Sequence, residues 1–110
     1  MTIKELLGKS GWKVFNEPID DQKEIKGVYC GDLLSWVMGN GQPGQAWITV
    51  QGHINTIAVA TLREFSCIIY ADNTPINDDT IEKAKEENVI IIASPLPVYE
   101  TAKVIMELDK

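Results

Sequence analysis

The sequence contains little of what metal and redox sites are built from. Its 110 residues include one histidine and two cysteines, and Cys30 and Cys67 form neither a CxxC pair nor a zinc-binding spacing. A structural disulfide is disfavoured in a cytosolic protein, and in a parallel sheet these two positions fall at opposite strand ends. We therefore interpret both thiols as small buried hydrophobic side chains, and we expect neither a metal nor a cofactor.

The chain also lacks a membrane anchor signal and an excess of positive charge. No apolar run approaches the roughly 20 residues that a membrane-spanning helix needs, and the start, Met1–Lys9, is too charged for a secretory signal. Ten basic and sixteen acidic side chains give a net charge of −6, which repels nucleic-acid backbones and anionic lipid. We expect a cytoplasmic protein that binds neither nucleic acid nor a membrane.

What the sequence does contain is a regular alternation of strand and helix patterns. Its length predicts a single domain over residues 1–110. The predicted strands are 12–15, 26–30, 47–50, 67–70 and 89–93, and the predicted helices are 2–9, 33–38, 54–65, 78–87 and 98–108. Residues 18–25 are predicted to be an acidic loop. Such alternation implies an α/β fold of three layers, α/β/α, with a mainly parallel sheet of about five strands.

Local signals place several helix ends and one turn. Thr2 and Glu5 have the spacing of a capping box, in which each side chain bonds to the other residue's backbone amide. The carboxylate of Asp32 is placed to cap the N-terminus of the helix 33–38. Gly39 is expected to end this helix in the left-handed conformation. Pro43-Gly44 predicts a type II turn before the next strand.

The segment 54–65 could be a buried strand by propensity, but its spacing favours a helix. Apolar residues at intervals of four, four and three form one stripe. The stripe consists of Ile54, Ala58, Leu62 and Phe65. Asn55 is placed as an N-cap. Because Val59 and Ala60 add apolar surface outside the stripe, we expect a second covered face, as in a homodimer.

The carboxyl ends of the predicted strands carry most of the polar residues that could bind a ligand. In open α/β sheets, this edge gathers loops and helix N-termini. The residues placed there are Gly31, Asp32, Gln51, Gly52, His53, Asn55, Asp72, Thr74, Ser94 and Pro95. We call this group the carboxyl rim. It predicts a site for a small ligand.

The carboxyl rim matches no known catalytic motif. His53 could act as a general base, yet no serine or cysteine nucleophile stands at motif spacing, and a lone histidine is more often a hydrogen-bonded loop residue. Asp32 and Asp72 are weak evidence for a metal site. The glycines at 39, 41 and 44 lack the lysine and the serine or threonine of a phosphate-binding loop. A small enzyme using His53 and Asp32 is therefore the least favoured alternative.

Several separated blocks of the sequence resemble one family. They are VYCGDLLSWVMG at 28–39, AWITVQGHIN at 46–55 and TIEKAKEENVI at 80–90, with an alanine-containing helix after Asn55. In this order, over residues 25–108, they resemble the DRTGG domain. This α/β domain is related to the N-terminal domain of HPr kinase/phosphorylase. It occurs beside CBS domains in some manganese-dependent pyrophosphatases, in some phosphate acetyltransferases, and as small stand-alone proteins.

The resemblance implies a self-associating regulatory or assembly domain without catalysis of its own. The positions most typical of the family are Gly31-Asp32 and the segment Thr49–Asn55. The resemblance therefore adds Thr49 to the candidate ligand-binding residues. One segment departs from the family. Where many members have a glycine-rich turn after the fourth strand, this chain has Tyr-Ala-Asp-Asn at 70–73, which puts a ligand-binding role of that turn in doubt.

Three functions remain open from the sequence. The first is a non-catalytic homodimeric regulatory domain that senses a small anion, nucleotide or other phosphate-bearing metabolite at the carboxyl rim. The second is an adaptor that docks onto a neighbouring enzyme through its acidic surface. The third is the small enzyme using His53 and Asp32.

Overall fold

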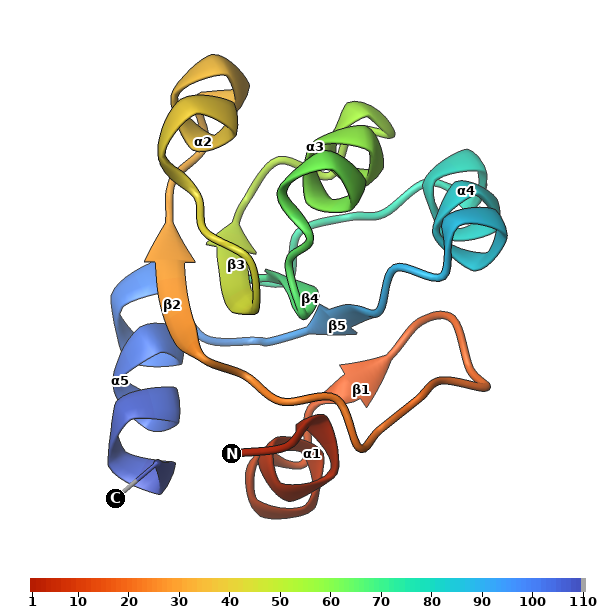
Figure 1. Ribbon diagram of the computed structural model, residues 1–110. Coiled ribbons are helices and arrows are strands. Elements are labelled where there is room, and N and C mark those ends of the chain that lie inside the picture. Colours follow the sequence, from red (N-terminus) through yellow and green to blue (C-terminus); the bar gives the residue numbers. More distant parts are fainter. Residues whose placement is uncertain (110) are drawn as a thin grey trace.

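A five-stranded sheet in the order β1-β5-β4-β3-β2 forms the middle layer of the computed structural model, which describes residues 1–109 (Figure 1). The strands are β1 (Lys13–Val14), β2 (Gly27–Cys30), β3 (Gln45–Thr49), β4 (Cys67–Tyr70) and β5 (Ile91–Ala93). The helices are α1 (Ile3–Ser10), α2 (Leu34–Asn40), α3 (Asn55–Arg63), α4 (Asp78–Glu87) and α5 (Val98–Leu108). Strands β2 to β5 are parallel, and β1 joins β5 antiparallel at one edge. The predicted α/β fold is confirmed.

The two faces of the sheet bury separate cores because side chains alternate along each strand. On the face covered by α1 and α5, Ile48 and Ile69 pack with Ile105 of α5. On the face covered by α2, α3 and α4, Trp47 and Ile68 pack with residues of all three helices. Residues 1–14 thus form a helix that covers one face of the sheet and a strand at its edge.

Several of the predicted helix ends and the predicted turn are confirmed. Thr2 and Glu5 form both hydrogen bonds of the capping box at the start of α1. Gly44 has a φ of 84°, and the amide of Gln45 donates to the carbonyl of Gln42, as a type II turn requires. Asn88 ends α4 with a φ of 56°, in the left-handed conformation.

The two predicted ends of the helix after β2 are wrong. Leu33 occupies the N-cap of α2 and no side chain caps it, because the carboxylate of Asp32 bonds to β3 instead. Gly39 lies inside the helix, which continues to Asn40 and ends at Gly41 with a φ of −65°. No left-handed residue is needed at this exit.

The core-facing side of α3 also differs from the prediction. Ala58 and Leu62 of the predicted stripe are exposed, and Ile54 is half-buried; only Phe65, after the helix, is buried. The face toward the sheet consists of Thr56, Ile57, Val59 and Ala60. Thr56 fits this face because its hydroxyl bonds to the hydroxyl of Tyr70 (2.6 Å) and to the carbonyl of His53. The helix does have two apolar faces, but the exposed one is the predicted stripe.

Candidate functional site

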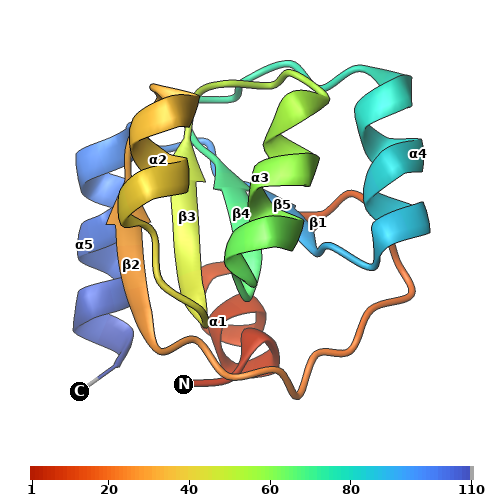
Figure 2. The same cartoon turned by 45° about the horizontal axis from the view of Figure 1, so that its top comes forward.

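Strand register brings the carboxyl ends of the four parallel strands to one edge of the sheet. Cys30 pairs with Ile48, Thr49 with Tyr70, and Tyr70 with Ala93. The loops that follow these strands therefore meet at one edge, at the top of the sheet in Figure 2. The structure places the carboxyl rim, with Thr49 added, where the sequence predicted it.

Asp32 connects the loop after β2 to the end of β3. Its Oδ1 atom accepts hydrogen bonds from the hydroxyl of Thr49 (2.7 Å) and from the amide of Val50 (2.9 Å). The same Thr49 hydroxyl accepts a bond from the amide of Gln51 (3.1 Å). Beside it, the indole of Trp47 donates to the carbonyl of Gly31 (2.9 Å). The Gly31-Asp32 turn is thus held in place by a charge-assisted contact and a buried tryptophan.

The sequence assigned the N-cap of the helix to Asn55, but Ile54 is the N-cap of α3 and the side chain that bonds to the first turn is that of His53. The Nδ1 atom of His53 accepts a bond from the amide of Asn55 (3.1 Å), and its carbonyl accepts one from the amide of Thr56 (3.0 Å). Asn55 is therefore the first residue of α3 and not its N-cap. With Nδ1 as an acceptor, the neutral ring carries its proton on Nε2, which leaves one donor for a ligand.

The remaining rim residues bond mainly to the protein. The hydroxyl of Thr74 donates to the carbonyl of Ala71 (2.6 Å). Ser94 is fully buried, and its hydroxyl lies 2.8 Å from that of Thr101 and accepts a bond from the amide of Leu96 (3.1 Å). Thr101 itself donates to the carbonyl of Leu96, so Ser94 is the donor of the pair. Ser94 therefore positions the loop after β5.

The turn after β4 keeps a backbone conformation that favours glycine, although it contains none. Asp72 and Asn73 have φ angles of 60° and 54°. Among non-glycine residues, aspartate and asparagine adopt this left-handed region most readily. The amide of Asp72 donates to the carbonyl of Leu96 (2.7 Å) and that of Asn73 to the carbonyl of Ser94 (3.2 Å). The turn after β4 thus has a left-handed backbone at two residues that are not glycine.

The side chains that the carboxyl rim exposes are acidic or neutral. Asp32, Gln51, His53, Asn55 and Asp72 are exposed, whereas Thr49 and Ser94 are fully buried. Two more carboxylates, on residues 78 and 79, stand in the first turn of α4. The exposed groups therefore suit the hydroxyl and amine donors of a ligand better than its phosphates.

The two cysteines differ in exposure, which corrects half of the prediction. Cys67 is fully buried, and burial raises the pKa of its thiol to about 12. Cys30 is exposed at the end of β2, where desolvation raises the pKa of its thiol and the nearby Asp32 carboxylate adds to the effect. Within residues 1–109, no group of three or more His, Cys, Asp or Glu side chains could hold a metal ion. No helix of the same residues is long and apolar enough to cross a membrane.

Two cavities lie at the opposite edge of the sheet, where the sequence predicted no binding site. One of about 830 Å³ opens between the segment 16–23 and the residues that lead from α4 into β5. A second of about 610 Å³ is lined by residues before β2, β3 and β4 and by the end of α4. Lys23, Asn88 and Val89 line both. The composition of residues 18–25 gave no sign of a binding role.

Comparison with known proteins gives a match in structure but not in sequence. No family model and no curated protein matches the sequence. The fold matches a crystal structure of the CBS and DRTGG domains of the regulatory region of Clostridium perfringens pyrophosphatase, complexed with the activator diadenosine tetraphosphate. The TM-score is 0.74 over 97% of this chain, at 15% sequence identity.

This chain has the fold of part of that regulatory region. The DRTGG resemblance predicted from the sequence is thereby confirmed at the level of fold. The match spans 46% of the pyrophosphatase chain, so what that protein binds and does belongs to a longer chain. Functions of this DRTGG-like chain have to be argued from its own residues.

Proposed function

We propose that this chain is a non-catalytic regulatory domain that binds a small ligand of the nucleotide class at its carboxyl rim. The observation that carries the proposal is the fold match to a regulatory region whose structure holds a nucleotide activator. The convergence of four strand ends on one edge supports it, because ligands of open α/β sheets gather there. Of the nine candidate residues, seven can contact the ligand: Gly31, Asp32, Gln51, His53, Asn55, Asp72 and Thr74. The other two, Thr49 and Ser94, are fully buried and position the loops of the rim.

The chemistry of the exposed groups indicates how such a ligand would lie. Within residues 1–109, no hydrogen bond involves Oδ2 of Asp32, and this oxygen can accept the hydroxyls of a ribose. The Nε2 of His53 is a donor on the same edge. Because Asp32 and Asp72 repel phosphates, the sugar or base faces these carboxylates and any phosphate points away from them.

Hydrogen bonding at the rim also supports a role without catalysis. The hydroxyls of Thr49, Thr74 and Ser94 each donate to a protein acceptor, so none is poised as a nucleophile. The Nδ1 atom of His53 is occupied by the amide of Asn55 and cannot at the same time accept a substrate proton. The hydrogen bonding of these side chains therefore favours ligand binding without catalysis.

Calorimetric titration with adenosine, AMP and ATP tests the proposal, with Asp32→Asn as the variant. Asparagine keeps an Oδ1 acceptor for Thr49 and Val50 but replaces the free carboxylate oxygen with a donor. We expect a saturable heat for at least one of these compounds, weakened about tenfold in Asp32→Asn. Asp20→Asn serves as the control, because this carboxylate lies on the opposite edge and, among residues 1–109, bonds only to the amide of Gln22. If none of the compounds binds at millimolar concentration, the ligand proposal is wrong.

We further propose that the chain forms a homodimer through α2 and α3. These helices lie side by side on one face of the sheet (Figure 1) and expose large apolar side chains, with Trp36 at 66% and Leu62 at 64% exposure. Leu33, the N-cap of α2, and Ala58 of α3 are also exposed. Apolar groups gathered in this way are typical of a protein interface. The occupant proposed here is a second copy of the chain.

Light scattering at high micromolar concentration tests the dimer. We expect twice the monomer mass for the wild type and the monomer mass for Trp36→Glu/Leu62→Glu. Tyr99→Glu, an equally exposed aromatic site on α5 and on the other face of the sheet, should remain dimeric. A wild-type monomer would overturn the dimer and favour the adaptor alternative, in which a partner enzyme covers this surface.

A further inference from the structure

The segment between β1 and β2 runs around the amino edge of the sheet and borders an open cavity of about 830 Å³. Figure 2 shows this segment passing the C-terminal end of α4 and crossing under the starts of the strands. Residues 16–20 and Lys23 form one wall of the cavity, and residues from Ala84 to Ile90 form the other. A volume of this size falls within the range of small-molecule sites.

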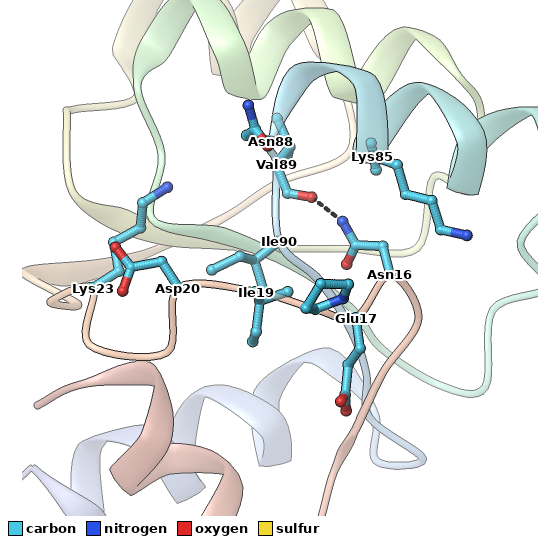
Figure 3. Close-up of a pocket in the computed structure, with 11 residues that line it drawn as sticks. Asn16, Glu17, Ile19, Asp20, Lys23, Lys85, Asn88, Val89 and Ile90 are labelled. Atoms are coloured by element: carbon cyan, nitrogen blue, oxygen red, sulfur yellow. Dashed lines mark hydrogen bonds between the residues drawn. The ribbon is translucent and has the colours of Figure 1, made fainter.

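Both ends of the segment are fixed to the domain. At one end, the buried side chain of Asn16 donates to the carbonyl of Val89 (2.5 Å) and accepts from the amide of Ile91 (3.1 Å), and Figure 3 shows the first of these bonds. At the other end, the carbonyls of Asp21 and Lys23 accept bonds from the amides of Lys4 (2.8 Å) and Ile3 (3.0 Å). The cavity is therefore preformed.

The floor of the cavity is apolar. Ile19 comes from the segment and packs against the core that contains Ile90, as Figure 3 shows. Ala84 and Val89 also line the cavity, but they are buried in the core on the other face of the sheet. None of these side chains can bond to a polar ligand. The floor therefore suits an apolar ring or chain.

Lys23 and Glu17, two charged groups around the cavity, form no ion pair among residues 1–109. Lys85 pairs with Glu82 (3.7 Å), and in Figure 3 its ammonium group and the carboxylate of Glu17 point away from Ile19 and Ile90. Asp20 accepts a bond from the amide of Gln22 (3.2 Å). Among residues 1–109, no ion pair includes Lys23, which is half-buried and lines this cavity and the 610 Å³ cavity beside it.

We infer that this cavity is a second binding site, for a small molecule with an apolar ring and one anionic group, a carboxylate or a phosphate. The ring packs against Ile19 and Ile90, and the anion pairs with the ammonium group of Lys23. This site is separate from the carboxyl rim and does not depend on the function proposed for it. Unlike the exposed side chains of the carboxyl rim, the lining of this cavity includes a lysine that can bind an anion.

The test is an NMR titration with three matched probes, 1-naphthyl phosphate, 1-naphthoate and neutral 1-naphthol. We expect one or both anionic probes to shift the amides of residues 16–23 and 85–90 in a saturable way. In Lys23→Gln, the affinity of the anionic probes should fall about tenfold, while the weaker affinity of 1-naphthol should not change. The phosphate and carboxylate arms show which anion the site prefers.

Lys9→Gln is the matched control, since it removes the same charge from an exposed lysine of α1 that lines neither cavity. It should bind like the wild type. Equal affinity in the wild type and in Lys23→Gln, or shifts confined to α2 and α3, would overturn the inference. The naphthyl probes contain no nucleoside. A failure of the naphthyl titration would therefore not affect the nucleotide proposal for the carboxyl rim, and a failure of the nucleotide titration would not affect the proposal for this cavity.

Discussion

Asp32 and Thr49 are joined by a hydrogen bond of 2.7 Å that ties the loop after β2 to the end of β3. The same carboxylate oxygen accepts the amide of Val50. Replacing Asp32 by alanine removes both bonds, and we expect the free energy of unfolding to fall by about 1–3 kcal/mol. Asp32→Asn should lose less, because it keeps the acceptor. Urea denaturation of the two variants measures the difference, and equal loss in both would contradict the contact.

Gly39 and Gly52 should respond to alanine in opposite directions. A Cβ atom on Gly52 would lie 2.4 Å from the carbonyl oxygen of Pro75, a backbone atom that cannot move away cheaply. One on Gly39 would meet nothing within 4 Å, and this residue lies inside α2. We expect Gly39→Ala to raise the unfolding free energy by up to about 1 kcal/mol and Gly52→Ala to lower it. Destabilisation by Gly39→Ala would support the left-handed helix exit expected from the sequence.

Cys30 and Cys67 should differ in their reaction with a thiol reagent. Cys30 is exposed, whereas Cys67 is fully buried and burial raises its thiol pKa to about 12. Titration with 5,5′-dithiobis(2-nitrobenzoate) should modify one thiol per native chain and two in denaturant. The variant Cys30→Ser should show no reaction while folded. A rapid reaction of the folded variant would place Cys67 at the surface.

The capping box of α1 should contribute to the acid sensitivity of the fold. Hydrogen bonds from the amide and then the hydroxyl of Thr2 hold the pKa of Glu5 below its ordinary value of 4.5. Because the folded pKa is the lower one, this stabilisation is present above pH 4.5 and is lost as the pH falls through the folded value.

Glu5→Gln tests this pH dependence. Glutamine can still accept the Thr2 amide but does not titrate, so the unfolding free energy of the variant should depend less on pH below about 4.5. Denaturation curves between pH 3 and pH 7 measure the effect. Identical pH profiles for the variant and the wild type would contradict it.

The sequence predicted best those features that depend on neighbours three or four residues away. The capping box of Thr2 and Glu5, the turn at Pro43-Gly44 and the end of α4 at Asn88 are all of this kind. The order of strands and helices followed from alternation of the same local patterns. The fold class and the meeting of strand ends at one edge followed in turn.

Features that depend on distant contacts were predicted wrongly or not at all. Thr56 looks polar in sequence, yet it faces the core because it bonds to Tyr70, and this reverses the faces assigned to α3. Asp32 looks like a helix cap until the register of β2 and β3 puts Thr49 beside it. The cavity depends on Asn16 bonding to Val89, which lies 73 residues further along the chain.

An NMR titration with adenosine and AMP shows whether the carboxyl rim binds a nucleotide-class ligand. We expect saturable shifts of the amides of residues 31–32, 49–55 and 72–74, and smaller shifts in Asp32→Asn. If these amide resonances do not shift at millimolar adenosine and AMP, or if only amides outside these residues shift, the proposed binding at the carboxyl rim is contradicted.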